Sequence, residues 1–264
     1  MERRRHPVRR SNPRRLIAAF VVFLAWSGAA HAQDIIFNNS VGLATGNIQS
    51  FTTTQTLLNT IEPNDALGYR PKGTGLGALF GARRASAGAI QTAYAASPDV
   101  SRRVQSQFLD WARSVDGTDA DRLEQAMARY DFVDIYKGIV RGFGLGADDA
   151  ADAYTAYWVL NWMMANGSGD PSRSDVMAAR SQVDQSLATN ATFAGFSEAE
   201  RQEMAEVFIY NFVVQHGAYF GAIQRGQTGL VRQLSDAAQV RFANEMGVDL
   251  RGMSLTSLGF RKKG

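Results

Sequence analysis

The sequence predicts an all-α fold, a multi-helix bundle built around one buried central helix and preceded by a less ordered N-terminal segment. Two observations support this prediction. After Ala82, apolar residues recur every three or four positions, which is the spacing of one helix face. The stretch Asp148–Gly167 is apolar and aromatic on most sides, which is typical of a helix in the middle of a larger assembly.

The first 32 residues have the three parts of a secretory signal peptide. Arginines crowd Arg3–Arg15, an apolar run follows at Leu16–Trp26, and Ala30-His31-Ala32 provides a cleavage site. This apolar run is shorter than the roughly 20 residues of a membrane-spanning helix, which favours cleavage over an uncleaved membrane anchor. We therefore expect a periplasmic or secreted bacterial protein, cleaved after Ala32, with no stable membrane insertion after cleavage.

The charge of the chain depends on this cleavage. The whole chain has 28 basic and 25 acidic residues, of which seven arginines and one glutamate lie in residues 1–32. Subtracting the leader leaves 21 basic and 24 acidic residues, so the mature chain has a net charge of −3. A slightly acidic chain lacks the electrostatic signature of nucleic-acid binding, so we expect no nucleic-acid partner. The sequence has no cysteine, which excludes disulfides, thiol catalysis and cysteine-bound zinc.

Residues 33–81 are less regular than the rest and end in a glycine-rich stretch, Tyr69–Gly81. Within it, Gly73-x-Gly75-x-x-Ala78 superficially matches a dinucleotide-binding fingerprint. That motif requires a preceding strand and a following helix, and Arg70-Pro71-Lys72 is not a buried strand. We interpret 33–81 as an irregular segment with a flexible linker, and we expect no cofactor.

The helical domain is expected over 82–260, beginning with three helices before the central one. Pro98 suits the first turn of a helix that Asp116-Gly117 ends, and a short second helix follows around Leu123. A third helix has a strong one-face pattern and stops at Gly142. Its apolar positions are Phe132, Ile135, Tyr136, Ile139, Val140 and Phe143.

Three further helices are expected after the central one. Ser172 or Ser174 opens the first, and the capping box Ser197–Glu200 opens the longest, which Gly226 ends. The last long helix runs from Leu230 to Met246, with Gly247 as its C-cap. Met253–Phe260 is expected to be a semi-ordered tail docked on the core, followed by a solvated basic tail at 261–264.

The central helix itself contains one unexplained polar residue, Asn161. Asp148, Asp149 and Asp152 complement the positive end of its dipole, and Gly167 suits the left-handed turn after it. Asn161 lies between two tryptophans, where it is either a ligand contact at the floor of a pocket or a core amide bonded to a facing helix. The second interpretation is favoured because buried amides need partners.

An asparagine also lies among aromatics in the longest helix, at Phe208-Ile209-Tyr210-Asn211-Phe212. We hypothesise that the two most apolar helices pack together and that Asn161 and Asn211 lie near their contact. The nine aromatic residues of these helices more often indicate a core than a ligand pocket at such regular spacing.

His216 is the only histidine after residue 32. It is either a general base or pH-sensitive contact, or a histidine at the edge of the core bonded to a carbonyl, which is the favoured interpretation. No G-x-S-x-G elbow accompanies it, and one imidazole cannot form a histidine-rich metal site. The acidic groups of Asp148–Asp152 and Glu198–Glu206 occupy first turns, where the helix dipole explains them. We therefore predict no catalytic residue and no metal site.

Two segments resemble a functionally uncharacterised family of bacterial secreted helical proteins, a domain of unknown function with a Y-W-x-x-N-W helix. One is Ala150–Gly167, with its A-D-A-x-x-A-Y-W-V-x-N-W core and terminal N-G. The other runs from Gly247-Val248-Asp249-Leu250 to Gly259-Phe260. The resemblance covers roughly Ala82–Phe260 and implies an exported helical domain, without implying any catalytic residue.

Two functions are consistent with these observations. The first is a non-enzymatic binding or interaction module of the cell envelope, whose partner is a protein or an envelope component. The alternative is a small-ligand binder or hydrolase with an aromatic-lined pocket between the two most apolar helices. In that alternative, Tyr157, Asn161, Asn211 and His216 are the polar groups of the pocket. A robust helical core without a recognisable catalytic set favours a protein that is not an enzyme.

Overall fold

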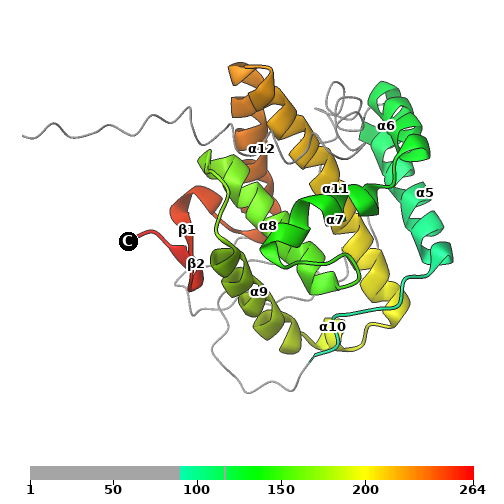
Figure 1. Ribbon diagram of the computed structural model, residues 1–264, viewed down its shortest axis with the longest axis horizontal. Coiled ribbons are helices and arrows are strands. Elements are labelled where there is room, and N and C mark those ends of the chain that lie inside the picture. Colours follow the sequence, from blue (N-terminus) through cyan, green and yellow to red (C-terminus); the bar gives the residue numbers. More distant parts are fainter. Residues whose placement is uncertain (1–89, 116) are drawn as a thin grey trace, which may run out of the picture.

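The computed structural model describes residues 90–115 and 117–264, which form helices packed around a central one and a short C-terminal hairpin (Figure 1). In chain order the elements are α5 (Pro98–Val115), α6 (Gly117–Arg129), α7 (Phe132–Val140), the 3-10 turn η5 (Arg141–Phe143), α8 (Ala150–Asn166), α9 (Arg173–Ala188), α10 (Ala191–Ala194), α11 (Glu198–Gln224), α12 (Thr228–Met246), η6 (Leu250–Gly252), β1 (Met253–Thr256) and β2 (Gly259–Lys262). The predicted all-α class is confirmed.

Helix α8 is the buried central helix that the sequence predicts. All its residues from Ala150 to Ala165 except Asp152 are buried, and it packs against α9, α11 and α12. Aromatic rings form the contacts, since Tyr154 and Tyr157 meet Phe208 of α11 at 4.9 and 5.2 Å between ring centroids. Trp158 meets Phe242 of α12 edge-on at 4.7 Å. The expected packing of the two most apolar helices is therefore confirmed.

The predicted helix boundaries rest on caps that are present in the structure. The Asp149 carboxylate accepts hydrogen bonds from the first N–H groups of α8, and Gly167 ends that helix with φ of 58°. Ser172 and Ser197 each form a capping box, at the starts of α9 and α11. These local signals position the long helices that enclose the interior.

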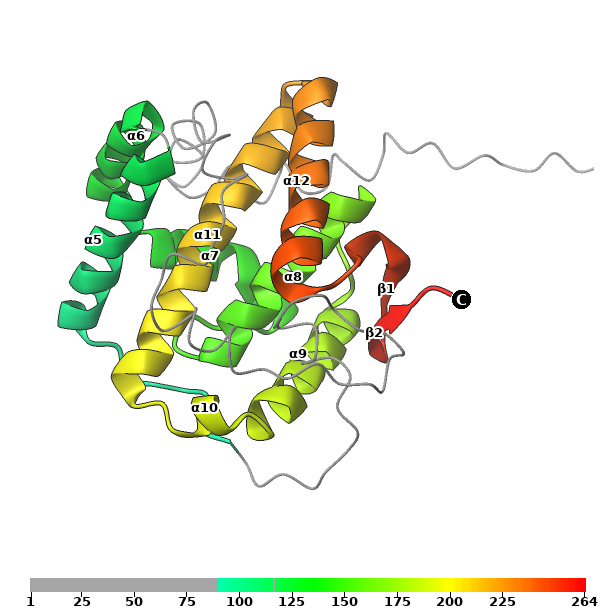
Figure 2. The ribbon, with the colours of Figure 1, turned by 180° about the vertical axis from the view of Figure 1, so that it is seen from behind.

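The C-terminal segment is more ordered than the predicted tail. Strands β1 and β2 pair in antiparallel fashion and dock beside α8 and α9, at the side of the molecule opposite α5 and α6 (Figure 2). Trp162 Nε1 donates to Met253 O at 2.9 Å, and the amide of Gln182 bonds both the N–H and the C=O of Phe260. Gly259 has φ of 83° and lies so close to Gln182 that a Cβ atom would collide with it. Strand β2 continues to Lys262, past the predicted start of the solvated tail.

The first described residues, 90–97, run extended into α5, which begins at Pro98 as the sequence predicts. Here Ala93 forms an isolated antiparallel bridge with Asp149, so the backbone hydrogen bonds of this segment go to the loop before α8. Hydrogen bonds to the loop before α8 and to the first residue of α8 therefore hold this segment in place.

The predicted signal peptide, the irregular segment 33–81 and the glycine-rich linker lie outside the described residues. Within 90–115 and 117–264, no helix has the length and apolar character needed to span a membrane.

Candidate functional site

An apolar pocket of about 40 Å³ lies between α7, η5, α8 and α11, with the loop after α8 at its edge. Most of its walls come from aliphatic and aromatic side chains of these helices. The lining residues are Ile139, Val140, Phe143, Leu145, Ala156, Val159, Leu160, Met163, Asp170, Pro171, Val176, Phe212, His216 and Phe220. The pocket lies where the apolar face of α7 meets the apolar faces of α8 and α11.

His216 is the imidazole of this pocket. It lies on α11 between two aromatic residues one turn away, with its ring 5.6 Å from Phe212 and 4.5 Å from Phe220. The side chain is 5% exposed, and its ring packs against these two phenylalanine rings. The part of His216 that lines the pocket is apolar, as is the rest of the exposed wall.

Burial also sets the charge of His216. Desolvation lowers the pKa of this imidazole from 6.5 to about 4, so it is neutral at pH 7. An imidazole with so low a pKa is a weak base at neutral pH, and efficient general bases have a pKa near the working pH. This geometry therefore suits the binding of an apolar group better than proton transfer.

The other three predicted residues do not line this pocket. Tyr157 packs its ring between Phe208 and Phe242. Asn161 donates to Tyr157 O at 2.8 Å, and its Oδ1 accepts from Arg241 Nη2 at 3.1 Å. Asn211 donates to Val207 O at 2.9 Å. The predicted set therefore does not converge, and the two asparagines each bond to a carbonyl of their own helix.

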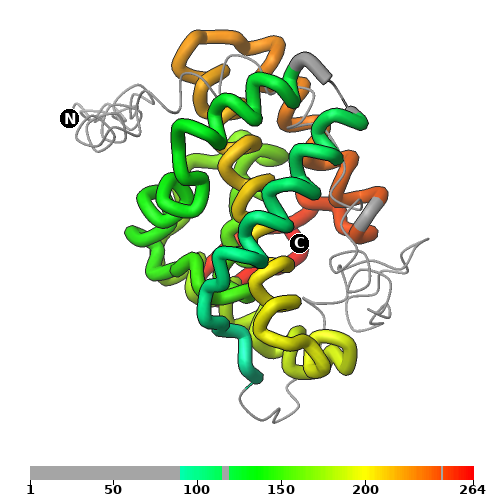
Figure 3. Tube along the Cα trace, turned by 90° about the vertical axis from the view of Figure 1, so that its right-hand side faces the viewer, coloured from blue at the N-terminus to red at the C-terminus, as the bar shows by residue number. Residues whose placement is uncertain are grey.

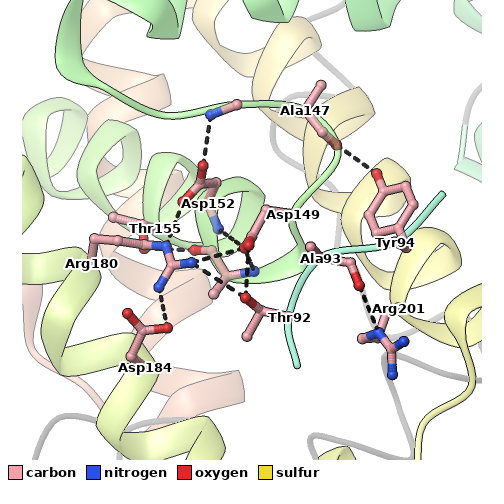
Figure 4. A network of polar contacts seen from close by, with 12 residues as sticks. Thr92, Ala93, Tyr94, Ala147, Asp149, Asp152, Thr155, Arg180, Asp184 and Arg201 are labelled. Carbon is pink, nitrogen blue, oxygen red and sulfur yellow. Dashed lines mark hydrogen bonds and ion pairs between the residues drawn. The ribbon is translucent and has the colours of Figure 1, made fainter. Parts of the chain in front are cut away.

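A second polar centre, which the sequence did not indicate, is the Arg180 network (Figure 4). Arg180 of α9 donates from Nη2 to Asp149 Oδ1 at 2.9 Å and from Nε to Asp152 Oδ1 at 2.5 Å, and it also pairs with Asp184. Thr92 Oγ1 donates to Asp149 Oδ2 at 2.7 Å. The network joins the extended segment 90–97, the start of α8 and α9.

The acids of α8 thus do more than complement the helix dipole. Burial raises the pKa of Asp152, against the opposing effects of the Gly146 N–H and of Arg180. A guanidinium shared by three carboxylates explains why the acids at this helix start tolerate burial. We assign this network a structural role. Across the described residues, no group of three or more histidine or acidic side chains is arranged to hold a metal ion.

Taken together, the fold and the pocket define a helical bundle with a small apolar pocket that contains a neutral imidazole. The chain matches the model of a family of unknown function (DUF6683) over residues 11–263, and it belongs to that family. The resemblance to an uncharacterised family is therefore confirmed. Comparison with curated proteins and with solved structures gave no match.

Proposed function

We propose that this chain is an exported, non-enzymatic binding module that receives a small apolar group in the His216 pocket. The observation that carries the proposal is the apolar wall of this pocket, to which the buried, neutral imidazole of His216 contributes no polar surface. A small cavity with an apolar lining suits an apolar group.

The size of the pocket limits the ligand. A cavity needs roughly 10–15 Å³ for each water molecule, so about 40 Å³ accommodates only a few heavy atoms. A short alcohol or the end of an alkyl or acyl chain fits this size. Leu160 and Phe212 would surround the carbon atoms of that group.

Export supports an envelope component as the source of this group. The basic leader, the apolar run and the site after Ala32 favour delivery to the periplasm or the exterior. Acyl and alkyl chains are abundant at membranes there. The proposed partner is therefore an envelope molecule that presents the end of an apolar chain to the face between α7 and α8.

Calorimetric titration of the purified protein with 1-hexanol tests the proposal. Saturable binding is expected, with a negative heat-capacity change because apolar surface is buried. Ala156→Leu places extra atoms in the pocket and should abolish binding. Val240→Ala, on an exposed position of α12, is the matched control and should bind as the wild type does. Undiminished binding by Ala156→Leu would reject this pocket as the site.

A further inference from the structure

A second and larger pocket, of about 320 Å³, lies where α5 and α11 meet the turn between α6 and α7. Helices α5 and α11 run side by side here (Figure 3). The lining residues include both polar and aromatic side chains: Ser101, Gln105, Met127, Ala128, Arg129, Tyr130, Asp131, Phe132, Val133 and Tyr210. The His216 pocket shares none of these residues, so the two sites are separate.

The carboxylate of Glu206 lies directly behind this wall. Ser101 Oγ, which lines the pocket, donates to Glu206 Oε1 at 2.6 Å, and Gln202 Nε2 donates to the same oxygen at 2.8 Å. Glu206 is 3% exposed, and the hydroxyl of Tyr210 also hydrogen-bonds its carboxylate, although its Oε2 has no well-aligned donor within the described residues. A buried carboxylate oxygen without a well-aligned donor is costly, so a positive charge at this wall would stabilise it.

The surrounding groups make the pocket a hydrogen-bond acceptor. The Ser101 hydroxyl donates its proton to Glu206 and accepts a hydrogen bond from Gln202 Nε2 at 3.0 Å. One lone pair of its oxygen is then left to accept a further hydrogen bond. Burial raises the pKa of Tyr210, and the neighbouring Glu206 and Asp131 charges raise it further. Asp131 lies at the exposed side of the pocket and caps α7 with Oδ1. The polar wall is therefore negative in character.

Aromatic rings complete the lining. Tyr130, Phe132 and Tyr210 all contribute to the wall, and an aromatic face attracts a cation within about 6 Å of its centre. Arg129 is the cationic lining residue, and its exposed side chain can turn toward solvent. A ligand that matches acceptors, negative charge and aromatic faces is an organic cation with N–H donors.

We propose that this pocket binds a primary organic ammonium ion, with its N–H groups toward Ser101 and Tyr210 in front of the Glu206 carboxylate, and its carbon chain against the tyrosine rings. This site is independent of the apolar His216 pocket and goes beyond the function proposed above. Either site can fail its test without affecting the other.

Calorimetric titration of the purified protein with n-butylammonium chloride, at a fixed low salt concentration, tests the proposal. We expect saturable binding and at least about tenfold weaker binding of 1-butanol, which has the same chain without the charge. Glu206→Gln should weaken n-butylammonium binding by about tenfold or more, because hydrogen bonds to a charged group are the strong ones. Tyr210→Phe keeps the ring and should weaken binding to a smaller extent.

Glu203→Gln is the matched control. Glu203 lies one turn earlier on α11, is also buried and pairs with Arg103 at 3.1 Å, so its substitution removes a nearby negative charge without touching the pocket wall. We expect it to bind n-butylammonium nearly as the wild type does. Circular dichroism establishes that each variant is folded, and Tyr210→Phe carries the test if Glu206→Gln is not.

Three outcomes would overturn the proposal. They are an absence of saturable n-butylammonium binding, equal affinity for 1-butanol, and equal weakening by Glu203→Gln and Glu206→Gln. The last result would indicate a general effect of charge rather than a built site.

Discussion

Among the buried titratable groups of helix α11, Glu206 and His216 have surroundings that differ sharply. Glu206 lies beside α5 within a polar network that includes Ser101 and Gln202. His216 lies beside α7 and α8 among phenylalanine rings, at the wall of an apolar pocket. One helix, buried on nearly every side, thus places a hydrogen-bonded carboxylate behind one pocket and a neutral imidazole at the wall of another.

The difference shows how burial acts on charge. Desolvation disfavours the charged form in both places, so it raises the pKa of Glu206 and lowers that of His216. At Glu206, hydrogen bonds from Ser101, Gln202 and Tyr210 oppose this effect. At His216, desolvation acts without a comparable opposing contact. The surroundings of Glu206 thus tolerate a charge, whereas those of His216 favour a neutral group.

The largest expected effect comes from placing a carboxylate in the apolar pocket. His216→Glu should destabilise the protein by about 3–4 kcal/mol at pH 7, because a carboxylate buried without partners has a pKa raised by several units. Chemical denaturation measures the change, with His216→Phe as a control that keeps a ring in the pocket. A loss below about 1 kcal/mol would mean that the pocket solvates charge, contrary to the difference from Glu206.

The pH dependence of stability is expected to change next most strongly. The pKa of His216 is about 4 in the folded protein and 6.5 for an ordinary, solvated imidazole, which is the value expected in the unfolded chain. Between these two pH values, the unfolded chain therefore binds the proton more readily than the folded protein does. Its contribution to stability is fully present above pH 6.5 and is lost as the pH falls toward 4, by about 3 kcal/mol.

Denaturation of the wild type and His216→Phe at several pH values between 7 and 4 measures this loss. The phenylalanine variant should lack the His216 contribution while retaining that of every other group. Parallel curves for the two proteins would show that His216 is solvated or paired.

A smaller change in stability is expected from substitution of Glu206, in the N-terminal half of α11. The pKa of Glu206 is raised in the folded protein, so its ionised carboxylate lowers the free energy of unfolding at neutral pH. This destabilisation decreases as the pH falls toward 4.5. Glu206→Gln should therefore be at least as stable as the wild type at pH 7, within about 1 kcal/mol, and the difference should shrink at pH 5. Denaturation at the two pH values measures it, and a loss of several kcal/mol would indicate that the charge itself holds α5 to α11.

The smallest expected effect is the coupling between the two core asparagines. Each donates to a carbonyl of its own helix, and Asn161 also accepts from Arg241. A double-mutant cycle with Asn161→Leu and Asn211→Leu should therefore give a coupling free energy below about 0.5 kcal/mol. A coupling above about 1 kcal/mol would restore the direct pairing suggested by the sequence.

Local signals account for what could be predicted. Asp149, Ser172, Ser197 and Gly167 act within a few residues of their own helix ends, so the boundaries of α8, α9 and α11 could be read from the chain. The burial of α8 followed from its nearly uniform apolar character.

The sites depend on residues brought together from distant parts of the chain. The His216 pocket combines Ile139, Ala156 and Phe212 from three helices, and Arg180 meets Asp149 across 31 positions. Helical periodicity indicates which face is apolar but not where two faces leave a gap, so only His216 of the four predicted polar residues lines that pocket. Within the buried network, the ion pair of Arg180 and Asp184 joins residues four positions apart on one helix, so it is the contact that the sequence could have indicated.

The central claim is that His216 is neutral at pH 7 and lies at the wall of the apolar pocket. The most direct test is ¹⁵N NMR of His216 in the chain from Gln33 onward, which contains a single histidine. Its nitrogen shifts should titrate with a midpoint near pH 4 and stay constant between pH 5.5 and 7.5. Addition of 1-hexanol at pH 7 should move them because the ligand packs beside the ring. A midpoint near pH 6.5, with shifts that 1-hexanol leaves unchanged, would contradict both the burial of this imidazole and its role in binding.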